Sequence, residues 1–207
     1  VEILEVFALE SDGATARRCE EAGWNLSLVN SDVMGVLGSS VSPRGPVAVI
    51  SIPESPALEA RDSVVLWDIA DPGNAGTIIR TAGAFGFQVV ATRDTVDLWS
   101  PKVIRSAVGG HFRALPILGI ESDPRVLLKA GIAPLAAVAG SSTSVRDAVR
   151  RAGPVGLLIG NEAHGLPAEV VDNPEVAAFS VPMPGGSESL NAGVAAGIAM
   201  YLRMTSR

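Results

Sequence analysis

Short runs of consecutive apolar residues recur along the chain, and segments with apolar residues three or four positions apart separate most of them. A run that is apolar at almost every position, such as residues 64–70, predicts a strand buried on both faces. Alternation of such strands with helical segments predicts an α/β fold with a mostly parallel sheet. The strands expected in the second part of the chain are residues 64–70, 88–91, 115–118, 134–139, 156–159 and 178–181.

Between these strands, apolar residues occur at the spacing of a helix, and a long apolar helix is expected at the C-terminal end. The expected helices are residues 74–85, 102–108, 124–129, 145–151 and 190–204, with a short one after Pro167.

A turn-rich stretch, Pro53-Glu54-Ser55-Pro56, divides the chain because prolines disfavour continued helix or strand. We therefore expect a partial small α/β domain over residues 1–53, a linker over 54–62 and a second domain over 63–207. Within the first domain the expected elements are strands 3–8, 25–29 and 47–52, a helix 15–22 and a loop 39–46.

Composition supports a folded protein: 47% of the 207 residues are hydrophobic and 18% are charged, so a sizeable core is available. No apolar run reaches the roughly 18–20 residues of a membrane span, and residues 1–9 lack the features of a signal peptide. The single cysteine, Cys19, is interpreted as a small core residue, and together with the missing signal it favours the cytoplasm. The native N-terminus is expected to extend beyond Val1.

The formal charge of −6 argues mildly against nucleic acid, but the charge is unevenly distributed. One basic stretch has only Asp94 and Asp97 opposing it, and it is either an RNA-contacting face or a solvated surface. Its members are Arg93, Lys102, Arg105, His111 and Arg113.

Three polar loops follow expected strands, and in parallel sheets ligands bind at the carboxyl ends of strands. In the first loop, Asn74 is a candidate N-cap, and Arg80 lies one helical turn from Gly76 and Thr77. The Arg80 guanidinium is able to grip a phosphate or carboxylate in bidentate fashion, or else pairs with a nearby acid.

In the second loop, Gly160 permits close approach to the backbone, Glu162 hydrogen-bonds a ligand or caps a helix, and His164 is a general base or merely solvated. In the third, Ser187 and Ser189 are candidate caps of the last helix. That helix is rich in Ala and Gly, which fits either a core helix or a subunit interface.

No Walker A lysine, dinucleotide fingerprint or metal-ligand cluster is present in the sequence. The residues alone therefore indicate an α/β domain with a polar ligand site built from three loops.

Taken together, the three loops resemble the signature motifs of the SpoU/TrmH family of the SPOUT methyltransferases, from residue 64 to residue 201. Residues 100–116 also resemble the family's region between its first two motifs, although Ala107 stands where the family often has Ser. The resemblance implies a C-terminal deep trefoil knot, S-adenosyl-L-methionine (SAM) as cofactor, no metal, and a homodimer with its sites at the interface. It also identifies the first 53 residues as part of a ribosomal-protein-like RNA-binding domain.

The resemblance further implies roles for individual residues. The motif residues expected to be catalytic are Asn74, Arg80, Glu162, Ser189 and Asn191. Those expected to bind SAM are Gly140, Gly160, Asn161, Val181, Met183, Ser189 and Leu190. Those expected to contact RNA are Arg80, Lys102, Arg105 and Arg113.

The implied reaction is methylation of a ribose 2′-hydroxyl in structured RNA, with 23S ribosomal RNA favoured over transfer RNA. Arg80 would hold a phosphate and stabilise the developing alkoxide, with a phosphate oxygen or Glu162 as proton acceptor. The alternatives are a tRNA methyltransferase, a non-catalytic knotted RNA-binding or assembly protein, and an unrelated nucleotide-binding oxidoreductase.

Overall fold

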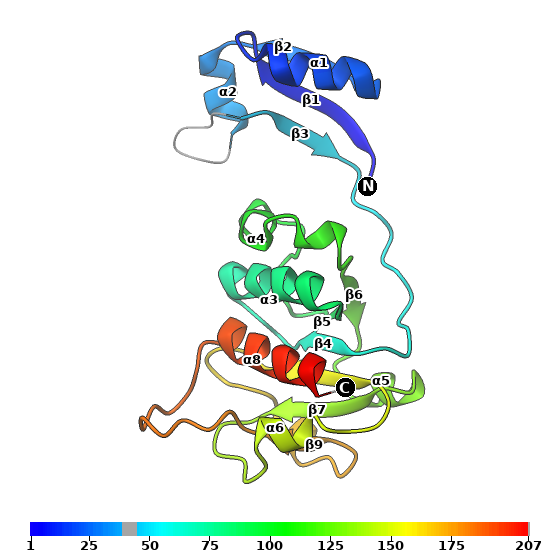
Figure 1. The fold of residues 1–207 in the computed structure, drawn as a ribbon, viewed down its shortest axis with the longest axis vertical. Coiled ribbons are helices and arrows are strands. Elements are labelled where there is room, and N and C mark those ends of the chain that lie inside the picture. Colours follow the sequence, from blue (N-terminus) through cyan, green and yellow to red (C-terminus); the bar gives the residue numbers. More distant parts are fainter. Residues whose placement is uncertain (39–44, 207) are drawn as a thin grey trace. The chain divides into compact units, whose positions relative to one another are not determined.

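The computed structural model describes residues 1–38 and 45–206, and the chain divides into two compact units, Val1–Glu54 and Ser55–Arg207 (Figure 1). The loop expected over residues 39–46 falls mostly outside the described residues. No helix in the described part of the chain is both long and apolar enough to cross a bilayer.

The first unit is a small α/β layer in which β1 is central, pairing in parallel with β2 and antiparallel with β3. All three strands were expected from their apolar runs. A second helix, whose N-cap is Asn30, was not predicted. The elements are β1 (Ile3–Leu9), α1 (Gly13–Ala22), β2 (Leu26–Val29), α2 (Ser31–Leu37) and β3 (Val47–Ile50).

The second unit holds a six-stranded sheet in the order β6-β5-β4-β8-β7-β9, and every strand pair in it is parallel. The predicted mostly parallel sheet is therefore confirmed. Its strands are β4 (Ser63–Leu66), β5 (Gln88–Thr92), β6 (Ile117–Ile120), β7 (Ala133–Ala137), β8 (Val155–Ile159) and β9 (Ala177–Phe179).

Successive strand residues alternate between two buried clusters, which shows that helices cover both faces of this sheet. On one face Val64 and Leu66 pack with α3 and α8, and these two helices lie side by side (Figure 1). On the other, Val65 and Trp67 join Leu127 of α5. The helices are α3 (Pro72–Phe85), α4 (Pro101–Ala107), α5 (Arg125–Lys129), α6 (Val145–Ala148), α7 (Ala168–Val171) and α8 (Ala192–Thr205), with a 3₁₀ turn η1 (Gly110–Phe112).

Several predicted elements extend beyond their observed ends, and two of them do so by three residues or more. The strand expected over 64–70 ends at Leu66, because Asp68 adopts a left-handed backbone with φ of 55°. The helix expected over 145–151 ends at Ala148. Beyond it, the carbonyl groups of Val149 and Arg151 accept hydrogen bonds from a side chain of α8.

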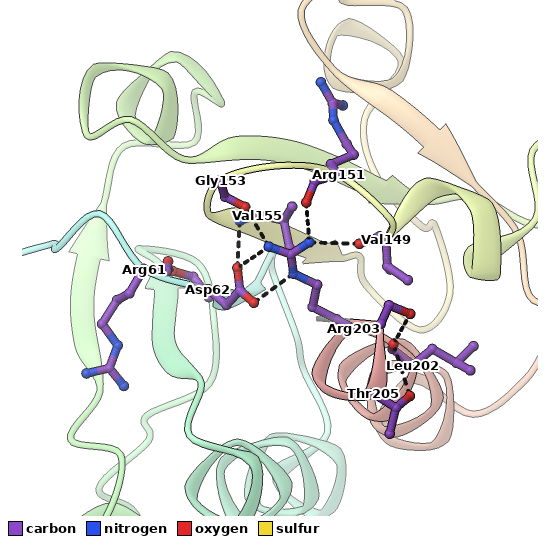
Figure 2. Close-up of polar contacts among 11 residues, drawn as sticks. Arg61, Asp62, Val149, Arg151, Gly153, Val155, Leu202, Arg203 and Thr205 are labelled. Atoms are coloured by element: carbon purple, nitrogen blue, oxygen red, sulfur yellow. Dashed lines mark hydrogen bonds and ion pairs between the residues drawn. The ribbon is translucent and has the colours of Figure 1, made fainter.

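That side chain is Arg203, which forms a buried ion pair with Asp62 just before β4 (Figure 2). Arg203 Nε donates to Asp62 Oδ2 at 2.8 Å, and Nη2 donates to Asp62 Oδ1 at 3.1 Å. The remaining N–H groups reach the carbonyl groups of Val149, Arg151 and Gly153 at 2.8, 2.7 and 2.5 Å. Every N–H group of the guanidinium thus donates a hydrogen bond, and these bonds hold the end of α8 against the sheet.

Candidate functional site

A cavity of about 750 Å³ opens at the carboxyl ends of β7, β8 and β9. Small residues, Ala139, Gly160 and Ala195, form part of its wall, and Val181 and Leu190 add an apolar surface. Its volume lies within the range of roughly 300–1,000 Å³ that is typical of small-molecule sites.

The three motif loops meet beside this cavity through a chain of side-chain hydrogen bonds. Asn191 Nδ2 donates to Asn74 Oδ1 at 2.7 Å, and Asn74 Nδ2 donates to Glu162 Oε1 at 2.8 Å. All three residues line the cavity. The structure therefore brings together three of the five residues expected to be catalytic, although they are 117 and 88 positions apart.

Glu162 is held in its ionised form by this arrangement. Besides Asn74, its carboxylate accepts hydrogen bonds from the backbone N–H groups of Ala70 at 3.1 Å and Asp71 at 3.2 Å. Burial raises the pKa of Glu162, but the hydrogen bonds from Asn74, Ala70 and Asp71 outweigh it and leave the pKa below its ordinary value. Such a carboxylate is suited to fixing two loops against each other more than to accepting a proton.

The prediction that Asn74 caps α3 is wrong. The helix begins at Pro72, and Asp71 is its N-cap, with Oδ1 accepting from the Asn74 N–H at 2.8 Å. Proline suits the first helical position because its missing N–H needs no partner there. The Asn74 side chain is thereby free to join Glu162 and Asn191.

The prediction that Ser187 or Ser189 caps the last helix is also wrong. Asn191 is the N-cap of α8, and its Oδ1 accepts from the Val194 N–H at 3.1 Å. The same side chain therefore starts α8 and reaches the first motif, while Ser189 lines the cavity.

The second loop is a tight turn closed by an antiparallel bridge between Asn161 and Gly165. Asn161 Oδ1 accepts from the backbone of Ala163 and His164, and its Nδ2 donates to the Asp68 carbonyl at 2.8 Å. The close approach to the Gly160 backbone is made by the following turn of the same chain. A Cβ at Gly160 would overlap the backbone of Gly165 and the next residue.

Replacing Gly160 with valine is therefore expected to displace the turn and to weaken SAM binding by roughly 5- to 150-fold, since such overpacking costs roughly 1–3 kcal/mol. Titration calorimetry with SAM measures the change. Gly185→Val is the matched control, because nothing lies within 4 Å of a Cβ at Gly185. Equal SAM affinity in both variants would remove the Gly160 turn from the binding site.

Most residues expected to bind SAM line the cavity, and those expected to contact RNA lie elsewhere. Gly140 and Arg80 are outside the cavity lining, and Arg80 is exposed on α3. Lys102 and Arg105 are exposed on α4, and Arg113 follows η1. The expected SAM residues in the lining are Gly160, Asn161, Val181, Met183, Ser189 and Leu190.

Sequence reasoning did not single out Ser180, Ala139 or Ala195 as cavity residues. They are small residues at strand ends or on a helix, a type that carries no local signal of function. His164 also lines the cavity, so both of its interpretations stay open. No group of three or more His, Cys, Asp or Glu is placed to hold a metal ion within the described residues.

Small residues of α8 are explained by packing inside the chain. A Cβ at Gly193 would lie 3.1 Å from Thr77 Cγ2 of α3, so these helices approach closely. A neighbouring face of α8 is different, since Val194 and Tyr201 are 49% and 51% exposed. The interpretation of α8 as a core helix therefore holds for the face that packs on α3. The other face is exposed, and there a subunit interface stays a prediction.

Comparison with known proteins places this site in a family. Residues 62–201 match the SpoU rRNA Methylase family. The chain is 35% identical to an uncharacterized tRNA/rRNA methyltransferase of Synechocystis sp. over 84% of this chain and 65% of that protein. It is 31% identical to the 23S rRNA (guanosine(2553)-2′-O)-methyltransferase RlmP of Bacillus subtilis, over 87% of this chain and 73% of RlmP.

Among solved structures, the fold is similar to an AdoMet-bound rRNA methyltransferase from Sinorhizobium meliloti, AdoMet being SAM. The TM-score is 0.84 at 27% identity, and the match covers 99% of this chain and 80% of that one.

Proposed function

This chain belongs to the SpoU rRNA Methylase family, and from that premise we propose that it transfers a methyl group from SAM to a ribose 2′-hydroxyl of RNA. The observation that carries the proposal is the meeting of Asn74, Glu162 and Asn191 at the mouth of the strand-end cavity. A relative's 2′-O-methyltransferase activity on 23S rRNA supports the same reaction here, with ribosomal RNA as the favoured substrate.

The cavity residues fit SAM. Small residues at Gly160 and Ala195 leave room for the ligand, Leu190 and Met183 offer apolar contact, and strand-end backbone groups offer hydrogen bonds to an adenine. When bound, SAM supplies an electrophilic methyl group. The chain's own contribution is to align the acceptor oxygen with that methyl group, which lowers the entropic barrier.

Arg80 provides the charge in this mechanism. Because an arginine stays protonated, it acts as an electrostatic group and not as a base. It holds a phosphate of the RNA next to the target nucleotide and stabilises the alkoxide that develops on the 2′-oxygen. A phosphate oxygen takes the proton, since hydrogen bonds from Ala70, Asp71 and Asn74 stabilise the ionised form of Glu162 and lower its pKa.

Glu162→Gln tests this division of roles. A positioning carboxylate predicts a fall in kcat of roughly 10- to 150-fold, the value of one hydrogen bond to a charged group, and its distinguishing sign is a pH profile of unchanged shape. A general base predicts a loss of roughly 10²–10⁴-fold and the disappearance of the acidic limb of the profile.

Because the folded pKa is lowered, the stabilising contacts of Glu162 are present above its ordinary pKa and are lost only as pH falls through the folded value.

We further propose a homodimer in which Arg80 of one subunit serves the cavity of the other. Within one chain Arg80 is outside the cavity lining, and the exposed apolar residues Val194 and Tyr201 on α8 offer a surface for a second copy. Mixing Arg80→Ala with Gly160→Val subunits should restore activity, because the hybrid carries one intact site. No restoration would place both residues in the same subunit's site.

The unit Val1–Glu54 is proposed to select the RNA, and the protein to act in the cytoplasm. Incubation with SAM and total RNA, which contains both ribosomal and transfer RNA, from cells lacking the gene tests the whole proposal. Methylation at one ribose supports it. Methylation of transfer RNA alone would favour the tRNA enzyme, and SAM binding without transfer would favour the non-catalytic assembly protein.

A further inference from the structure

An aromatic side chain stands exposed on the corner formed by α4 and η1. Phe112 is 68% exposed and Val108 is 64% exposed, although phenylalanine and valine are usually buried. The neighbouring residues Gly110 and His111 are buried. The turn that carries the exposed Phe112 side chain is therefore held in place by its buried neighbours.

The backbone of this corner is held in an uncommon conformation. Val108 and Gly109 have φ values of 46° and 77°, and a β-branched residue rarely adopts the left-handed region. Strain of this kind persists where surrounding contacts enforce it, and it often marks a functional site.

His111 anchors the turn that follows these two residues. Its Nε2 donates to the Leu98 carbonyl at 2.8 Å, and its ring lies 4.9 Å from that of Trp99. Burial lowers the pKa of His111, opposed by the hydrogen bond to Leu98, so the anchor is neutral at neutral pH.

The corner also adjoins the proposed catalytic arginine. A Cβ at Gly110 would lie 2.9 Å from Arg80 Cα, so the glycine lets η1 rest directly on α3 at that residue. Arg113, on the other side of Phe112, has its Cβ 3.2 Å from the position of a Cβ at Gly83 of α3. The turn that carries Phe112 and Arg113 therefore packs on the part of α3 that carries Arg80, and all three side chains are exposed.

The helices and the turn around Phe112 carry basic residues and no acidic ones. Residues 72–85 and 101–113, which make up α3, α4, η1 and the turn between them, contain no Asp or Glu. They contain exposed Arg80, Lys102 and Arg113. The centre of an interface between protein subunits is usually depleted of lysine, whereas aromatic residues among cations are typical of surfaces that bind single-stranded nucleic acid.

We propose that Phe112 stacks on the base of an unpaired nucleotide next to the target ribose, while Arg80 and Arg113 hold the flanking phosphates. This inference rests on the proposed function, and it adds that the substrate is single-stranded or splayed at the modified position. Val108 extends the apolar surface under the base. Stacking accepts any base, so Phe112 supplies affinity and register and leaves sequence choice to other contacts.

The test compares two fluorescent 12-nucleotide probes, oligoadenylate and an abasic ribose-phosphate strand, by anisotropy. Phe112→Ala should weaken oligoadenylate binding by roughly 5- to 150-fold, the value of stacking one base, and abasic binding less than twofold. Phe112→Tyr should bind like the unchanged protein. Leu118→Ala is the matched control, because Leu118 is an exposed apolar residue on β6.

Equal weakening of both probes, or no weakening of either, would overturn the stacking role. A dimer that becomes a monomer on Phe112→Ala, measured by sedimentation velocity, would assign the surface to a second copy instead. Methylation and SAM binding by the unchanged protein are measured in parallel. A protein that binds the probes through Phe112 but transfers no methyl group would keep the surface and refute the enzymatic function alone.

Discussion

Replacing Arg80 with alanine is expected to reduce methyl transfer at least about 10²–10³-fold, the usual cost of removing one donor that stabilises a developing oxyanion. SAM affinity should stay within a few fold, because Arg80 does not line the cavity. Single-turnover transfer of a radiolabelled methyl group measures the first quantity, and titration calorimetry measures the second.

Arg80→Lys is the control for this substitution. Lysine keeps the charge but lacks the planar fork of the guanidinium, so an intermediate rate is expected. If SAM affinity and transfer fell in parallel in Arg80→Ala, the residue would belong to the cofactor site and its role toward RNA would be wrong.

Replacing Arg203 with alanine is expected to lower the free energy of unfolding by about 3–5 kcal/mol, because it leaves a buried charge without its partner. Asp62 is only 4% exposed, and the carbonyl groups of Val149, Arg151 and Gly153 lose their donor as well. Urea denaturation followed by circular dichroism measures the loss.

Arg61→Ala is the matched control for Arg203→Ala. Arg61 is an exposed neighbour whose ion pair with Glu59 spans 3.7 Å, and a pair of this kind is worth about 0–1 kcal/mol. Similar destabilisation in the two variants would show that the buried network around Arg203 contributes nothing specific (Figure 2).

The strands of the larger unit could be predicted because burial on both faces leaves a continuous apolar run in the sequence. Their ends could not, since they depend on single backbone conformations. The left-handed Asp68 stops β4 although Ile69 is buried like the strand residues before it. The trefoil knot implied by the family resemblance stays a prediction.

The site was predictable at the level of loops and less so at the level of side chains. Asp71 and Asn74 are both good caps three positions apart, and Pro72 was the available signal for the earlier one. The pairing of Asp62 with Arg203 spans 141 residues. No local pattern indicates a contact at that separation.

The sequence also could not predict that Arg80 lies outside the cavity lining. Spacing along α3 places Arg80 less than two turns from Asn74, but only the packing of α3 against α4, α8 and η1 shows that it is exposed and outside the cavity lining. This packing is the physical basis for assigning Arg80 to RNA and the cavity to SAM.

The central claim, methyl transfer to a ribose 2′-hydroxyl, is tested most directly by alkaline digestion of RNA labelled with radioactive SAM. A 2′-O-methyl group blocks cleavage at its own phosphodiester, so the label should appear in alkali-resistant dinucleotides. Label in mononucleotides would mean methylation of a base, and unlabelled RNA would mean no transfer; either result would contradict the proposed function.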